Sequence, residues 1–340
     1  MVPVDERVAV VSEFLSGVSL GEPRTQGSLV LFPLLSEREA AREYLVLAEA
    51  LAQKMVEVTE REGGASVPEL LLNNGSDKDV LMLDGEMVVG GMQDRVLAIS
   101  ILAAAKSKLK LPVACTEAGR WGTRRSGMRF ASADWHSHAK MRAHLSEQVS
   151  ASLAFCQRVS ADQGDLWDEQ SRSQRAHRVA SPTSRMTDVY DRLEDQLGKQ
   201  LDTFKPEANQ VGALVMMAGS VVGLDAFDQA ATYEKLHDRL ARGYGLDVLE
   251  LEAKPVEPKR EVAAEFLRLV AGARDQAFPT VGRGEQHRLE NGGVTGSALA
   301  VEGKVIHLSA FAQEDQDGRI FGAEGLGAGR ITRRRRVRSQ

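Results

Sequence analysis

The stretch GEMVVGGMQDRVLAISILAAAKSKLKLPVACTEAGRW occupies residues 85–121 and sets the pattern for the whole chain. Short runs of valine, isoleucine and leucine alternate with glycine and polar residues, which is typical of β-strands joined by tight turns. Functional side chains follow these runs instead of the usual turn residues: Gln93, Arg95, Cys115, Glu117, Arg120 and Trp121. We therefore expect strands that present a ligand site at their ends.

The same strand-and-turn pattern occurs three times along the chain. The segments are VLMLDGEMVVG (80–90), ALVMMAGSVVG (213–223) and ALAVEGKVIHL (298–308). Gly85, Gly219 and Gly303 stand where a tight hairpin needs a positive φ. Either these are equivalent hairpins of one sheet system, or they are alike only because hairpins share this pattern. Both alternatives predict an α+β fold, in which helices pack on a mainly antiparallel sheet built from several hairpins.

Hydrophobic periodicity places the remaining elements. The predicted strands are 28–35, 56–61, 67–73, a pair beginning at Gln210, and a final hairpin over 295–311. The predicted helices are 36–54, 137–158, 161–179, 184–204, 228–243 and 256–274. Ser36 and Glu39 have the spacing of a capping box, which is the reason to begin the first helix there. We expect a single α+β domain over 1–312, with 136–205 as a helical insert or layer.

Composition limits the classes of function. The chain has 340 residues, 43% of them hydrophobic and 27% charged, as in an ordinary globular protein with a substantial core. Its net charge of −5 argues against nucleic-acid binding by the whole chain. No apolar run reaches the roughly eighteen residues of a membrane helix, and MVPVDERVAVVSEF has no signal-peptide core. We expect a cytoplasmic protein without membrane association, and a disordered Gly/Arg-rich tail over 313–340.

The candidate site admits alternative chemistries. Cys115 is a nucleophile if His307 is its partner, but without a histidine nearby in the sequence a buried wall residue is favoured. Arg120 with Trp121 can hold a phosphate or carboxylate while the indole stacks on a ring. Alternatively, Glu117 and Arg120 form a structural ion pair. Gln93 and Arg95 share a strand face, and the preceding glycines permit a bulge or the close approach of a ligand.

A metal site is not predicted. His136 and His138 have a spacing that can chelate from a strand, with His144 further on. This region has the composition of a solvent-exposed loop that enters a polar helix. The sequence contains no C-x₂-C, no H-E-x-x-H and no phosphate-binding loop of the P-loop type. The sequence therefore indicates no metal ligands, and it does not identify a cofactor.

The motifs GEMVVGGMQDR and LPVACTEAGRW resemble the signature of the ARG- and rhodanese-phosphatase-superfamily-associated protein domain. The similarity continues through NQVGALVMMAGSVVGLDAFD and VTGSALAVEGKVIHLSAF, and covers roughly 25–312. The first family motif reads Gly-Gly-Lys-Gln-Asn-Arg, whereas Met92 and Asp94 replace its lysine and asparagine here, with the loss of a positive charge. The matching residues are Gln93, Arg95, Cys115, Glu117, Arg120, Trp121, Gly223, Phe227, His307 and Phe311.

The resemblance implies association with ADP-ribosylglycohydrolase and phosphatase proteins of NAD and ADP-ribose metabolism. It brings no established activity, so whether the chain is an enzyme is left open. As an enzyme it would bind and process an ADP-ribose- or NAD-derived nucleotide, with Glu117 and His307 transferring protons. Arg95 and Arg120 would bind phosphate and Trp121 would stack on the base.

Gln93 and Cys115 would complete the binding surface for such a nucleotide. Two alternatives use the same residues. One is a non-catalytic nucleotide sensor, and the other is an interaction module whose polar cluster is only a buried salt bridge.

Overall fold

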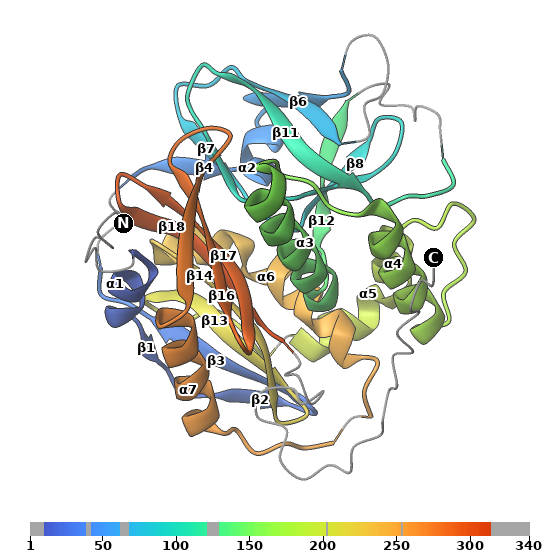
Figure 1. The fold of residues 1–340 in the computed structure, drawn as a ribbon. Helices are drawn as coiled ribbons and strands as arrows, with labels where there is room; N and C mark the ends of the chain where they lie inside the picture. Colours follow the sequence, from blue (N-terminus) through green and yellow to red (C-terminus); the bar gives the residue numbers. More distant parts are fainter. Residues whose placement is uncertain are drawn as a thin grey trace, which may run out of the picture.

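The computed structural model describes residues 10–38, 42–61, 68–120, 129–201, 203–252 and 254–313. These residues form seven helices and three sheets with mainly antiparallel pairing, so the predicted α+β class is confirmed (Figure 1). The predicted disordered tail lies outside the described residues, apart from its first residue.

The largest sheet has nine strands in the order β1-β3-β13-β14-β18-β17-β16-β15, with β2 also paired to β3. All of these pairings are antiparallel. In chain order its strands are β1 (Ser19–Leu20), β2 (Arg24–Gln26), β3 (Leu29–Leu35), β13 (Gln210–Met217), β14 (Ser220–Phe227), β15 (Arg274–Pro279), β16 (Glu285–Asn291), β17 (Val294–Val301) and β18 (Lys304–Ala312).

Two of the three predicted hairpins belong to this sheet. β13 pairs with β14, β17 pairs with β18, and β14 and β18 are neighbours. Their turns have positive φ at both central residues, 49° and 85° at Ala218-Gly219 and 54° and 73° at Glu302-Gly303. Positive φ at both positions is the geometry of a type I′ turn, which matches the right-handed twist of the flanking strands. The prediction is confirmed for these two segments.

The third segment, 80–90, is not a hairpin, and that prediction is wrong. Gly85 has the expected positive φ of 81°. However, β7 (Asp79–Met82) belongs to a three-stranded sheet and β8 (Glu86–Gly90) to a six-stranded one. The chain passes from one sheet to the other here because β7 pairs with distant segments instead of with β8.

The three-stranded sheet has the order β10-β7-β4, with β4 (Tyr44–Val46) parallel to β7 and β10 (Ile101–Ala103) antiparallel to it. This arrangement contradicts the predicted helix over 36–54, of which only α2 (Leu47–Ala52) is helical; residues 39–41 lie outside the described part. Pairing with β7 and the burial of Tyr44 override the local helical pattern.

The six-stranded sheet closes on itself. Its order is β12-β8-β9-β11-β6-β5, and a bridge between Thr59 and Arg129 joins β5 to the start of β12. Its interior is apolar because Leu70 pairs with Leu111, and Val58 with Leu72. The result is a small barrel. Its other strands are β5 (Val56–Thr59), β6 (Glu69–Asn74), β9 (Arg95–Leu97), β11 (Lys108–Cys115) and β12 (Phe130–His136).

Helices cover both faces of the nine-stranded sheet (Figure 1). Val30 and Phe32 of β3 pack in the cluster formed with α1 (Val10–Ser16) and α7 (Arg260–Ala271). The alternate residues Leu29 and Leu31 pack toward α6 (Ala230–Val248) on the opposite face. The middle of the chain supplies α3 (Ala139–Cys156), α4 (Gln163–Ala176) and α5 (Thr187–Leu201), within the three predicted helical ranges. Of these, α3 lies against β17 and β18.

Candidate functional site

The candidate site lies at one end of the six-stranded barrel. β8 ends at Gly90, a turn follows, and β9 begins at Arg95. Cys115, the last residue of β11, is the direct partner of Arg95, so the two strands are neighbours in this sheet. Directly opposed residues of an antiparallel pair point to the same face, and Cys115 has the same parity as the interior residue Leu111. Arg95 therefore projects into the barrel.

Arg95 is a buried cation whose hydrogen bonding is incomplete. Its side chain is 0% exposed, and Nη1 lies 3.3 Å from Gln93 Oε1. Nη2 lies 3.6 Å from Glu60 Oε1, too far for a hydrogen bond. Within the described residues, Arg95 Nε and Nη2 have no hydrogen-bond acceptor and Glu60 Oε2 has no donor. Because buried polar groups normally find partners, these atoms are unused donors and an unused acceptor that suit a ligand's polar groups.

Gln93 and Cys115 lie beside this guanidinium. Gln93 Nε2 donates to the carbonyl of Glu117 at 2.6 Å, and the Cys115 thiol donates to Gln93 Oε1 at 3.2 Å. Burial raises the pKa of the Cys115 thiol, and the nearby charge of Arg95 only partly opposes it. A neutral thiol is a poor nucleophile, and among the described residues the Cys115 thiol contacts the side-chain amide of Gln93 and not His307. These contacts favour the role of a wall residue.

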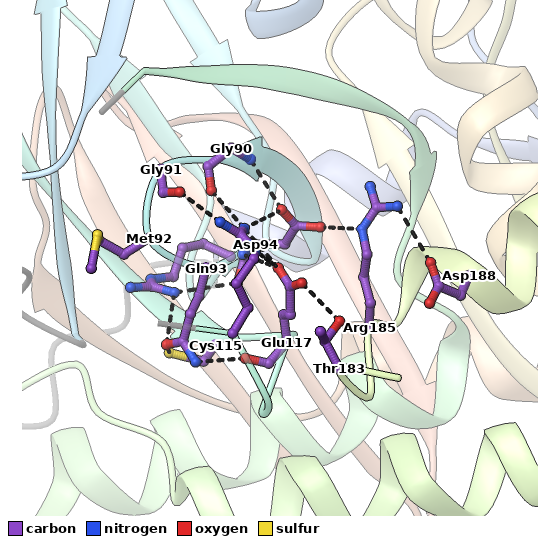
Figure 2. A network of polar contacts seen from close by, with 12 residues as sticks. Gly90, Gly91, Met92, Gln93, Asp94, Cys115, Glu117, Thr183, Arg185 and Asp188 are labelled. Carbon is purple, nitrogen blue, oxygen red and sulfur yellow. Dashed lines mark hydrogen bonds and ion pairs between the residues drawn. The ribbon is translucent and has the colours of Figure 1, made fainter. Parts of the chain in front are cut away.

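Arg120 ties the Gly90–Asp94 turn to Glu117. Its Nε donates to Glu117 Oε2 at 2.8 Å, while Nη1 and Nη2 donate to the carbonyls of Gly91 and Gly90 at 2.7 and 3.0 Å. Figure 2 shows Glu117 and Asp94 at the centre of this network. Thr183 also donates to Glu117 Oε1 at 2.9 Å. The guanidinium is thus used to hold the turn in place.

Glu117 is an ionised, anchored carboxylate. Burial alone would raise its pKa, but hydrogen bonds from Arg120 and Thr183 outweigh burial and lower it. A carboxylate with a lowered pKa and this set of donors is better suited to positioning than to carrying a proton.

Two members of the network, Arg185 and Thr183, are not predicted from the sequence. Arg185 Nε donates to Asp94 Oδ2 at 2.6 Å, and its Nη1 lies 3.4 Å from Asp188 of α5 (Figure 2). The backbone N–H of Gly119 donates to the carbonyl of Thr183, which is the second of these residues. Both lie in the connection between α4 and α5, which carries no pattern in the sequence that would point to the barrel.

The glycines of the turn are required by the protein's own packing. Gly90 and Gly91 have φ of 139° and 45°. A Cβ at Gly90 would lie 2.3 Å from the Arg129 carbonyl, and one at Gly91 would lie 2.4 Å from the Phe130 ring. The close approach that these glycines permit is thus made by Arg129 and Phe130 of the chain itself, where the expectation was a ligand.

His307 belongs to a different polar network. Its Nδ1 lies 2.8 Å from Ser100 Oγ, its Nε2 lies 3.2 Å from Asp225 Oδ1, and its ring stacks on Phe227 with centroids 4.7 Å apart. Among the described residues, no contact joins His307 to Glu117. The structure thus groups five of the predicted site residues, namely Gln93, Arg95, Cys115, Glu117 and Arg120. Trp121 lies outside the described residues.

The second network is centred on Arg142 of α3. Both of its terminal nitrogens donate to Asp225, at 2.6 and 2.8 Å, and Nη2 lies 3.5 Å from Asp84 Oδ2. Ser309 also donates to Asp84, at 3.1 Å. Burial by itself would raise the pKa of both carboxyls, but the charge of Arg142 outweighs burial and lowers it. The network is a buried set of paired charges that is not predicted from the sequence.

The prediction that residues 136–138 form a solvent-exposed loop is wrong. His136 and His138 are 3% and 1% exposed, because β12 extends through His136 and α6 packs against it. Burial, together with the charge of Arg142, lowers the pKa of His136 to about 3. His138 Nδ1 lies 3.1 Å from Asp247 Oδ1 of α6. Within the described ranges, no group of three His, Cys, Asp or Glu side chains is placed to hold a metal.

The fold and the site define an α+β protein in which a small barrel holds a buried arginine at one end. The model of the ARG and Rhodanese-Phosphatase-superfamily-associated Protein domain matches residues 17–311, and the chain belongs to this family. No curated protein and no solved structure is similar enough to give a match. No described helix is both long and apolar enough to cross a membrane.

Proposed function

We propose that the chain binds an ADP-ribose- or NAD-derived nucleotide at the end of the six-stranded barrel. The observation that carries this proposal is Arg95, a fully buried guanidinium with no acceptor for Nε and Nη2 among the described residues. A phosphate group supplies acceptor oxygens in the geometry that suits a guanidinium fork. Glu60 Oε2, which lacks a donor among the same residues, would accept from a ribose hydroxyl.

Membership of the family supports this class of ligand. The family name associates the domain with ARG proteins and with the rhodanese-phosphatase superfamily. An ADP-ribosylglycohydrolase acts on compounds that contain ribose and phosphate, and a phosphatase acts on phosphate esters, so a protein associated with them has reason to bind a phosphate-containing nucleotide. Such proteins are the proposed partners.

The other predicted residues have distinct roles in this proposal. Gln93 and Cys115 line the wall beside Arg95, and Trp121, which follows Arg120 directly in the sequence, stacks on the base. Glu117 and Arg120 position the turn, because their hydrogen bonds hold Gly90 and Gly91. Arg95 is not exposed, so binding requires that the turn opens. A binding protein fits these contacts better than a pair of proton carriers does.

Processing of the nucleotide is a second candidate, favoured by one arrangement. His307 lies between the Ser100 hydroxyl and the Asp225 carboxylate, at 2.8 and 3.2 Å. A histidine held by a carboxylate next to a hydroxyl is the usual arrangement for activating a nucleophile, and here the Ser100 hydroxyl must turn toward His307 from Asp84 Oδ1, to which it donates at 2.8 Å. In this candidate His307 is the proton carrier, and Glu117, which belongs to the other polar network, takes no part in the chemistry.

Thermal unfolding in the presence of ADP-ribose, NAD and AMP tests the binding proposal, with adenosine as the ligand that lacks phosphate. A ligand at 100 times its dissociation constant should stabilise the fold by about 2.7 kcal/mol. We expect stabilisation by at least one phosphate-containing compound, none by adenosine, and loss of the effect in Arg95→Met. Arg61→Met is the matched control, since Arg61 is in part exposed and pairs with Glu69.

Arg95→Lys tests whether the loss reflects binding or folding, because it keeps a positive charge in the barrel. It should melt near the wild-type temperature and bind more weakly, since lysine cannot form the bidentate contact. Absence of stabilisation of the unmutated chain by every nucleotide would overturn the proposal, as would equal stabilisation of a folded Arg95→Met variant. Turnover that is lost in Ser100→Ala and His307→Ala, with binding retained, would establish the second candidate.

A further inference from the structure

A cavity of about 400 Å³ lies apart from both polar networks, between α1 and the turn that joins β17 to β18. Figure 1 shows α1 beside β18, and the two elements are in contact. Its lining includes Phe14 and Arg38 on one side, Asp228 after β14, and Lys304, Val305 and Ile306 of β18. The volume falls within the range of about 300–1,000 Å³ that is usual for small-molecule sites.

One carboxylate oxygen in this lining lacks a partner. The Tyr44 hydroxyl donates to Asp228 Oδ1, and the Thr232 hydroxyl donates in turn to Tyr44. Asp228 Oδ2 is shielded and has no hydrogen-bond donor among the described residues. Asp228 is therefore held on one side by Tyr44, and its shielded Oδ2 accepts a donor from the cavity only after the side chains that cover it move.

Two cations lie in the same lining. Arg38 donates through Nη2 to the carbonyl of Glu13 at 2.8 Å and through Nη1 to the carbonyl of Phe14 at 3.2 Å. These contacts fix its positive charge at the end of α1. Lys304 lines the opposite wall and is exposed. With Glu13 and Asp228, the cavity has two charges of each sign.

The rest of the wall is apolar. Phe14 is 7% exposed and Val305 is 3% exposed, and both belong to the apolar cluster on the α1 face of the sheet, so their side chains form a packed surface. Such a wall favours a ligand with a hydrocarbon body over a fully hydrated ion.

We propose that this cavity binds a small zwitterion, a molecule with one ammonium group and one carboxylate or phosphate joined by an apolar body. The ammonium group donates to Asp228 Oδ2, the anionic group lies near Lys304 and Arg38, and the body packs on Phe14 and Val305. An anion without an ammonium group would leave Asp228 uncompensated, and an apolar molecule would leave Oδ2 without a donor. This inference is independent of the nucleotide site, since the two share no residue.

A series of zwitterions of increasing length tests the proposal by titration calorimetry on the full chain. The probes are 4-aminobutyrate, 6-aminohexanoate, leucine and phenylalanine. Hexanoate and hexylamine each keep one charge and the apolar body of 6-aminohexanoate. We expect one length of zwitterion to bind at least about tenfold more tightly than the singly charged analogues, because each lost charge leaves a partner unpaired.

Asp228→Asn and Lys304→Ala should each weaken that zwitterion at least about tenfold. Tyr44→Phe is the control for Asp228→Asn, since it removes the hydroxyl contact and keeps the carboxylate, and it should retain affinity. Melting temperature and circular dichroism establish that each variant is folded. No binding of any zwitterion at millimolar concentration, equal binding of hexanoate, or full affinity in folded Asp228→Asn would each overturn the proposal.

Binding should also depend on pH. Burial raises the pKa of Asp228 to about 6, against the hydrogen bond from Tyr44 and the charge of Arg42. The charged groups around the cavity are otherwise Glu13, Arg38 and Lys304. Affinity should hold above pH 6 and fall as the pH drops through 6, because a protonated Asp228 no longer attracts an ammonium group. A flat profile between pH 5 and 8 would overturn the assignment of Asp228.

Discussion

Glu86, the first residue of β8, combines burial with weak charge compensation. It is 4% exposed, its Oε2 accepts from the backbone of Leu83 at 3.1 Å, and its Oε1 has no hydrogen-bond donor among the described residues. The nearest cation, Arg239 of α6, lies 4.0 Å from Oε1. Burial raises the pKa of Glu86 to about 7, and the charge of Arg239 only partly opposes it.

This residue should make stability fall as the pH rises. A carboxyl with a raised folded-state pKa binds its proton more tightly in the folded chain, so its contribution is complete below the unfolded pKa and is lost as the pH passes through about 7. Glu86→Gln should therefore be more stable than the wild type at pH 8, by about 3 kcal/mol at most, and equally stable near pH 4. Urea unfolding at the two pH values measures this difference. Equal effects at both values would contradict it.

At the scale of elements, the turn after β7 shows why similar sequence patterns have different outcomes. Gly85 and Gly303 both have positive φ, 81° and 73°, yet only Gly303 closes a hairpin. A Cβ at Gly85 would lie 2.7 Å from Cγ of Arg142, whereas nothing lies within 4 Å of one at Gly303. A glycine is thus needed at position 85 because its φ is positive and because the buried side chain of Arg142 lies directly against it.

Substitution of the two glycines should separate these effects. Gly303→Ala should cost about 1 kcal/mol, which is the backbone strain of a non-glycine residue at positive φ. Gly85→Ala should cost about 2–4 kcal/mol, since the methyl group must also displace Arg142. Chemical denaturation of both variants provides the comparison. An equal loss in the two would show that Arg142 moves aside without cost.

At the scale of the whole molecule, the Arg142 network joins parts of the chain that no single sheet connects. Asp84 follows β7, Arg142 comes from α3, and Asp225 and His307 lie on neighbouring strands of the nine-stranded sheet. Arg142 also lies over the ring of Phe311, with Cζ 4.9 Å from the centroid. The smaller sheets and the large sheet are held together by charges as well as by apolar contacts.

Removal of this cation should be costly. Arg142→Ala leaves Asp84 and Asp225 without their principal counter-charge, and we expect a loss of about 3–5 kcal/mol in the free energy of unfolding. Arg268→Ala is the matched control, because Arg268 is 71% exposed and pairs with Glu265 on α7, and it should cost less than about 1 kcal/mol. Guanidinium unfolding curves test both. A loss below 1 kcal/mol for Arg142→Ala would mean that the buried carboxyls find other partners.

The local elements of the site could be predicted from the sequence. The hairpins at 213–223 and 298–308 follow from alternating apolar residues and a glycine turn, and the pairing of Arg95 with Cys115 follows from strands close together in the chain. Side-chain alternation and the φ requirements of a turn depend on a few neighbouring residues, and sequence patterns report them directly. The expectation of one domain over 1–312 stays a prediction.

Tertiary structure alone decided which distant residues meet. It made 44–46 a strand instead of a helix, drew Thr183 and Arg185 to the barrel, and placed His307 with Ser100 and Asp225 away from Glu117. The physical reason is that a buried charge must be paired within the fold, and its partner is selected by the packing of whole sheets and helices. Local sequence therefore determined the strands, the turns and the clustering of Gln93, Arg95, Cys115, Glu117 and Arg120. Global packing determined how completely the hydrogen-bonding groups of these side chains are paired, and Arg95 keeps donors that have no acceptor among the described residues.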